Sequence, residues 1–150
     1  MELLEAVVAR LNLVPVVKDS VFGIEELEEA ISNTGNRLRT PTAYVILLGE
    51  VAGENEMQTI THQHLVSTVG VVLAIGNTRN PRGVLGAGDK SNLYTVRKAI
   101  RDSLLNFDMD TQNEVYDPPE YLRGRLVQVQ DGVLWWQEEY RTGYYIRSQQ

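Results

Sequence analysis

The segment RLVQVQDGVLWWQEEYRTGYYIR, residues 125–147, is the strongest indicator of fold class in this chain. Most of its residues favour strands, and the dipeptide Asp131-Gly132 suits the positive-φ turn of a β-hairpin. The pattern therefore predicts two antiparallel strands, residues 125–130 and 133–147, with a bulge at Gly143.

The second of these strands carries aromatic side chains on both faces. Alternation places Trp136 and Tyr144 on one face, and Trp135 and Tyr145 on the other. A sheet covered by helices on one side needs only one apolar face, so the second face must be covered within the chain or by a partner. Because Trp and Tyr are enriched at the centres of interfaces, these four residues are interface candidates, with an ordinary core as the alternative.

The rest of the chain alternates helical and strand patterns. Apolar spacing predicts helices over residues 2–11, 24–31 and 92–107, the last of them capped by Asp89 or Ser91. Apolar runs predict strands over residues 43–48 and 62–75, which form a hairpin with a long, mobile polar tip at residues 49–59.

Residues 14–17 contain Pro15 and indicate a short edge strand or an extended linker. This order predicts an α+β fold, in which a mixed, mostly antiparallel β-sheet built from hairpins is flanked by α-helices that pack on one face. A length of 150 residues suits a single domain, residues 1–150.

Composition excludes several classes of protein. The absence of cysteine excludes disulfides and thiolate metal sites, and no apolar run is long enough to span a bilayer, so we expect no membrane association. The formal net charge of -6 argues against a protein that binds the phosphate backbone of nucleic acid. It is compatible with an acidic surface along which DNA moves without binding.

Two stretches suggest chemistry. In GVLGAGDKS, residues 83–91, Asp89 interrupts the spacing of a phosphate-binding loop before Lys90 and disfavours nucleotide binding. His62 and His64 project to the same side of a strand and could share a metal ion. Such a site needs a third ligand, which Glu54 or Glu56 could supply if the hairpin tip folded back, but nothing in the spacing requires that folding. We therefore expect no catalytic residue, cofactor or metal, and keep a small metal- or nucleotide-binding enzyme as an alternative.

Charged clusters offer further interface candidates. Arg79 and Arg82, together with Arg37 and Arg39, could grip a carboxylate on a neighbouring molecule, or remain solvated loop charges. The acidic group at residues 25–29 is expected to be a solvated helix face near a helix N-terminus.

Three stretches in order resemble the tail terminator proteins of long-tailed bacteriophages and prophages. They are TAYVILLGE (42–50), STVGVVLAIGNTRN (67–80) leading into the helix LYTVRKAIRDSLLNF (93–107), and DGVLWWQEEYRTGYYIR (131–147). The sequence departs from the family in the Gly-rich segment 83–91, which leaves the role of that loop open.

The resemblance implies a structural role without catalysis or cofactor. Such a protein forms a six-membered ring on the tail tube protein, ends tube polymerisation, presents the surface that meets head–tail connector or neck proteins, and lets DNA pass through its hole. It is assembled in the host cytoplasm and lies in the virion, at the head-proximal end of the tail. Another ring of the head–tail neck is the nearest alternative. On this view the hairpin tip reaches a neighbour or the tube, and Glu54, Glu56 or the 25–29 group lines the lumen.

Overall fold

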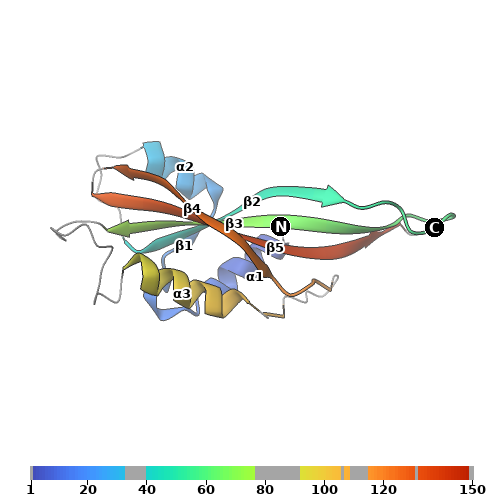
Figure 1. Ribbon diagram of the computed structural model, residues 1–150, viewed down its shortest axis with the longest axis horizontal. Helices are drawn as coiled ribbons and strands as arrows, with labels where there is room; N and C mark the ends of the chain where they lie inside the picture. Colours follow the sequence, from blue (N-terminus) through green and yellow to red (C-terminus); the bar gives the residue numbers. More distant parts are fainter. Residues whose placement is uncertain are drawn as a thin grey trace.

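The computed structural model describes residues 2–32, 40–76, 92–105, 107–108, 115–130 and 132–148 (Figure 1). Within these ranges a five-stranded sheet runs in the order β1-β2-β3-β5-β4. Only the β1–β2 pairing is parallel, which confirms the predicted α+β fold with a mixed, mostly antiparallel sheet. The strands are β1 (Val21–Phe22), β2 (Thr42–Ala52), β3 (His62–Gly76), β4 (Glu120–Gln130) and β5 (Val133–Arg147).

Helices cover both faces of the sheet, so the expectation that they pack on one face is wrong. Helices α1 (Glu2–Leu11) and α3 (Leu93–Leu104) lie together on one face, and α2 (Ile24–Ser32) lies on the other (Figure 1). The reason is that residues 43–47 of β2, 69–75 of β3 and 133–136 of β5 are apolar on both faces of the sheet. None of the helices in the described ranges is long and apolar enough to cross a membrane.

Each face has its own core. On the first face, α1 and α3 bury Leu3, Leu11 and Ile100 against sheet residues that include Val71 and Leu73. On the second face, Leu27 of α2 belongs to a smaller cluster that also contains Tyr44, Ile46, Val72, Ala74 and Trp135. The aromatic residues on both faces of the last strand therefore find cover largely within the chain.

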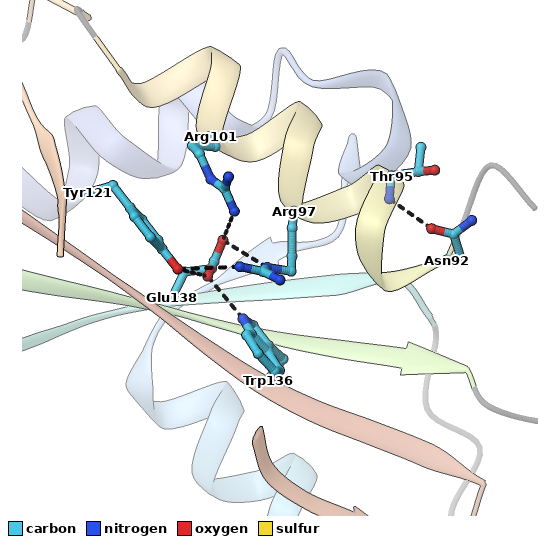
Figure 2. A network of polar contacts seen from close by, with 7 residues as sticks. All are labelled: Asn92, Thr95, Arg97, Arg101, Tyr121, Trp136 and Glu138. Atoms are coloured by element: carbon cyan, nitrogen blue, oxygen red, sulfur yellow. Dashed lines mark hydrogen bonds and ion pairs between the residues drawn. The ribbon is translucent and has the colours of Figure 1, made fainter. Parts of the chain in front are cut away.

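Two local predictions differ from the structure. Residues 15–17 form a short 3₁₀ helix, η1 (Pro15–Val17), and not an edge strand, because the fixed φ of proline suits a first helical position. The cap of α3 is Asn92, whose side chain accepts a hydrogen bond from the backbone N–H of Thr95 at 2.8 Å (Figure 2). Asp89 and Ser91, the caps expected from the sequence, lie outside the described residues.

The β3–β5 pairing is the longest in the sheet. Its register runs unbroken from His62 opposite Arg147 to Gly76 opposite Val133, so the bulge expected at Gly143 is wrong. Gly143 instead allows close approach, because a Cβ there would lie 2.7 Å from the backbone oxygen of Leu65. Two register shifts occur in the β4–β5 pairing, where they twist β4 at the edge of the sheet, and a third lies in the β2–β3 pairing between Leu47 and Gly49.

The turn between β4 and β5 follows the sequence prediction. Gly132 has a φ of 77°, which is the left-handed conformation expected of its position. This turn lets β4 return along β5 and places it on the outside of the sheet.

Candidate assembly interface

An arm extends from the body of the protein. It consists of residues 48–52 of β2, 62–68 of β3 and 141–147 of β5, which run past the helices to the end of the molecule that also holds the C-terminus (Figure 1). The strand β2 continues to Ala52, beyond its predicted end, because Glu50, Val51 and Ala52 still pair with β3. The hairpin tip is correspondingly shorter than the predicted residues 49–59.

Asn55 organises the tip of the arm. Its side-chain oxygen accepts hydrogen bonds from the backbone N–H of His62 at 2.8 Å and of Met57 at 3.3 Å. Its amide nitrogen donates to the carbonyl of Ile60 at 3.2 Å. Glu54 and Glu56, the acidic interface candidates, lie exposed on this tip.

An aromatic cluster lies at the base of the tip. The ring of Tyr145 stacks on His62 with 4.7 Å between centroids and lies 4.9 Å from the ring of His64. Tyr145 nevertheless exposes 50% of its surface, which makes it the most accessible of the four aromatic interface candidates. His62 also lies 3.3 Å from a guanidinium nitrogen of Arg147.

The two histidines have separate partners. Nε2 of His64 lies 2.8 Å from a carboxylate oxygen of Asp117, and Nδ1 of His62 lies 3.7 Å from a carboxylate oxygen of Glu56. Across the described ranges, no group of three or more His, Asp or Glu side chains is arranged to hold a metal ion. The arrangement is one hydrogen-bonded pair, His64 with Asp117, and one longer contact between His62 and Glu56.

Trp135, Trp136 and Tyr144 are packed within the chain. Trp135 exposes only 4% of its surface and lies in the core beneath α2, with its ring 6.0 Å from that of Tyr44. Trp136 and Tyr144 are half-buried and pack against the core on the opposite face. Arg79 and Arg82, and Lys90 of the interrupted phosphate loop, lie outside the described residues.

Sequence analysis did not identify the buried polar network around Glu138. This carboxylate on β5 has 0% exposure and accepts hydrogen bonds from Nε of Arg97 at 3.3 Å, the Tyr121 hydroxyl at 3.0 Å and the Trp136 indole at 2.9 Å (Figure 2). A guanidinium nitrogen of Arg101 lies 3.6 Å away. The only signal in the sequence was an acid at an inward-facing position of the alternating strand.

The network changes the proton affinity of its members. Burial lowers the pKa of Arg97, but the negative charge of Glu138 and hydrogen bonds to Tyr121 and Glu138 outweigh it and raise that pKa overall. Burial, followed by hydrogen bonding and charge from Glu138, raises the pKa of Tyr121. Burial and the same carboxylate raise the pKa of Tyr140. The network is therefore an ionic contact that joins α3 to the sheet.

Both outer edges of the sheet are open along much of their length. On one side β4 has no further strand among the described residues, and its Leu126, Val127 and Val129 are exposed. On the other side β1 pairs only with Ala43 and Tyr44, so β2 has no strand partner there in the described ranges from Val45 onward.

A groove lies beside the open edge of β2. It has a volume of about 540 Å³ and is mostly apolar, and its walls come from α1, the start of α2 and the middle of β2. The lining residues are Leu4, Glu5, Val8, Ala9, Asn12, Gly23, Ile24, Val45, Ile46 and Leu47. Neither the groove nor the exposed edge of β4 could be identified from periodicity, because each depends on which strands become neighbours.

Comparisons with known proteins bear on the family and on the fold of this chain. The sequence profile of the family described as "Phage tail terminator protein" matches residues 3–150. Among solved structures, a chain from "Virion of native gene transfer agent (GTA) particle" superposes with a TM-score of 0.55 at 15% identity, covering 96% of this chain and 95% of that one. No curated protein sequence matches. The structural likeness concerns the fold, whereas the family match spans nearly the whole chain.

Proposed function

The chain belongs to the phage tail terminator family, and on that premise we propose that it forms a six-membered ring that caps the tail tube. Family membership makes it a structural protein of the phage tail, located in the virion. The proposed ring ends polymerisation of the tube protein and then presents the surface that meets the neck proteins of the head. The observation that carries this proposal is the family match across residues 3–150.

The shape of the chain supports a role in assembly. A ring requires two unlike surfaces on each subunit that meet head to tail and close by rotation. The open edges of β4 and β2 are two such unlike surfaces on opposite sides of the sheet. The arm supplies a third surface, which projects away from the helices and is suited to reach the tube or a neighbouring subunit (Figure 1).

The acidic balance of the chain suits a lumen through which DNA passes without binding. The proposed lining groups are Glu54 and Glu56 on the arm tip or the acids of α2. These two groups lie at opposite ends of the molecule (Figure 1), so only one of them fits a narrow hole.

Electron microscopy of phage particles made without this protein tests the proposal. We expect tails of uncontrolled length and heads that are not joined to tails, and restoration of both when the protein is supplied. Purified protein added to tail tubes should give six-fold rings at one tube end. Tails of normal length in its absence would contradict the proposal.

A further inference from the structure

We propose that neighbouring subunits join through their sheet edges, with β4 of one copy lying along the open edge of β2 in the next and Leu126 and Val129 entering the groove beside α1. This inference rests on the proposed ring and identifies the surfaces that close it.

The donor surface is the outer edge of β4. Leu126 and Val129 expose 52% and 53% of their surfaces, and Val127 between them is also exposed. An edge strand of this length normally presents unpaired backbone groups to solvent, and exposed aliphatic side chains on such an edge favour pairing with another chain. The second register shift, between Leu126 and Gln128, gives this part of the edge its own twist, distinct from that of β5.

The acceptor surface is the groove along β2. Its apolar walls include Leu4, Val8 and Leu47, and its volume of about 540 Å³ leaves room for aliphatic side chains. The adjacent edge of β2 has no strand partner in the described ranges beyond Tyr44, so an added strand would find both free backbone groups and an apolar pocket.

The two surfaces are on the same face of the sheet. Val129 pairs with Leu134 and Leu126 pairs with Trp136, and both partners belong to the core beneath α1 and α3. Leu47 pairs with Val69 of the same core. Because cross-strand partners share a face, the exposed side chains of β4 and the groove both lie on the α1–α3 face.

Strand direction also fits. Both β2 and β5 run antiparallel to β3, and β4 runs antiparallel to β5. It follows that β4 is antiparallel to β2. Two copies can be placed side by side so that their α1–α3 faces point in the same direction. In that arrangement β4 of one copy meets β2 of the next as an antiparallel pair, and the sheet continues from subunit to subunit.

Charge favours the same pairing. Arg123 and Arg125 on β4 are exposed and share one carboxylate, Glu139, at 3.3 and 3.9 Å, so the edge keeps an excess of positive charge. Because Arg123 and Arg125 pair with Glu139 and Gln137, they lie on the α2 face, and on that face the mouth of the groove carries Glu26 next to Gly23. Opposite charges on the two edges favour a head-to-tail contact over pairing of two β4 edges, which would oppose four arginines.

The absence of cysteine makes cross-linking a direct test. Ala9 is exposed and lines the groove, and Val129 is exposed on β4. Full-length protein carrying both Ala9→Cys and Val129→Cys, assembled on tail tubes and treated with a short bifunctional thiol reagent, should give a ladder of covalent oligomers up to the closed ring. Each single variant alone should stay uncross-linked, and a mixture of the two should stop at dimers.

The outcomes separate this inference from the proposed function. Six-fold rings that form but do not cross-link overturn the edge contact and leave the terminator role intact. Dimers from Val129→Cys alone show that β4 pairs with itself and also overturn it. Failure of the unmodified chain to form rings on tubes overturns both proposals.

A second pair of variants checks the contact without cross-linking. Val129→Lys places a charge in the groove and should lower the fraction of ring-capped tubes about tenfold. Val115→Lys, at an exposed apolar residue outside β4 and outside the groove lining, should leave that fraction unchanged. Circular dichroism confirms that both variants are folded, and equal capping by the two would contradict the inference.

Discussion

Glu138 on β5 accepts a hydrogen bond from Nε of Arg97 on α3 at 3.3 Å, and the carboxylate has no exposed surface. One buried charge therefore ties a helix to the centre of the sheet. Breaking a buried pair by removing one member leaves the other uncompensated, which costs more than the pair contributes.

Glu138→Ala should lower the free energy of unfolding by about 3–5 kcal/mol, because Arg97 loses its carboxylate and the Tyr121 and Trp136 donors lose their acceptor. Urea unfolding followed by tryptophan fluorescence measures the change. The matched control is Glu120→Ala, which removes an exposed pair with Arg141 and should cost no more than about 1 kcal/mol. Equal losses in the two variants would show that the buried network contributes little.

Gly124→Ala should destabilise the fold through the same network. A Cβ at this position would lie 2.6 Å from the Tyr121 hydroxyl and 2.9 Å from the Trp136 ring, so these side chains must shift. We expect a loss of about 1–3 kcal/mol, typical of overpacking. Gly49→Ala is the control, since no atom lies within 4 Å of its added Cβ. Thermal unfolding of both variants checks the difference.

Alkaline pH should weaken the fold. The pKa of Tyr140 is raised from its ordinary value of 10.0, first by burial and then by Glu138. Above pH 10 the unfolded chain releases this proton while the folded chain keeps it, so stability present below pH 10 is lost as pH rises toward the folded pKa. Tyr140→Phe should reduce this loss by up to about 1.4 kcal/mol per pH unit. Urea titrations at pH 9 and pH 11 measure it, and an unchanged slope in the variant would refute the assignment to Tyr140.

Tyr145 should matter for assembly more than for folding. It is half exposed on the arm and stacks on His62, so Tyr145→Ala removes an accessible aromatic surface at modest cost in stability. We expect normal unfolding but fewer capped tubes in electron micrographs. Tyr145→Phe keeps the ring and should cap tubes as the unmodified chain does. If Tyr145→Ala caps as many tubes as the unmodified chain, Tyr145 is not part of the assembly interface.

Reversing charge at the arm tip tests the lumen proposal. If Glu54 and Glu56 line the hole, Glu54→Lys with Glu56→Lys should slow DNA ejection and give rings that retain DNA in a salt-dependent way. The same reversal at Glu28 and Glu29 on α2 is the control. Retention of DNA only by the α2 variant would place the lumen at the other end of the subunit.

Local chemistry made much of the fold predictable. Asp131-Gly132 located the hairpin, and Gly132 has the positive φ that its position requires. The apolar spacing of residues 92–107 predicted α3, which ends earlier, at Leu104. Its cap had to be found in the structure because Asn92 competes with neighbouring polar residues for that role.

Features that depend on distant neighbours could not be predicted. β1 has two residues and exists only because Val21 and Phe22 lie beside Ala43 and Tyr44. The sequence indicated that the side chain of Trp135 must be buried, but it did not indicate which element would cover it. In the structure α2 does so on the second face. The Glu138 network joins residues from β4, β5 and α3, and no spacing in the sequence relates them.

The unbroken pairing of β3 with β5 has a mechanical consequence. Fifteen residue pairs in one register make the arm continuous with the strands that lie beneath α1 and α3. A load applied at the tip cannot be absorbed by a hinge along this ladder, so it is delivered to the helices. Each subunit therefore acts as a rigid arm, and a force on the tip is transmitted along β3 and β5 to the helices at the other end of the protein.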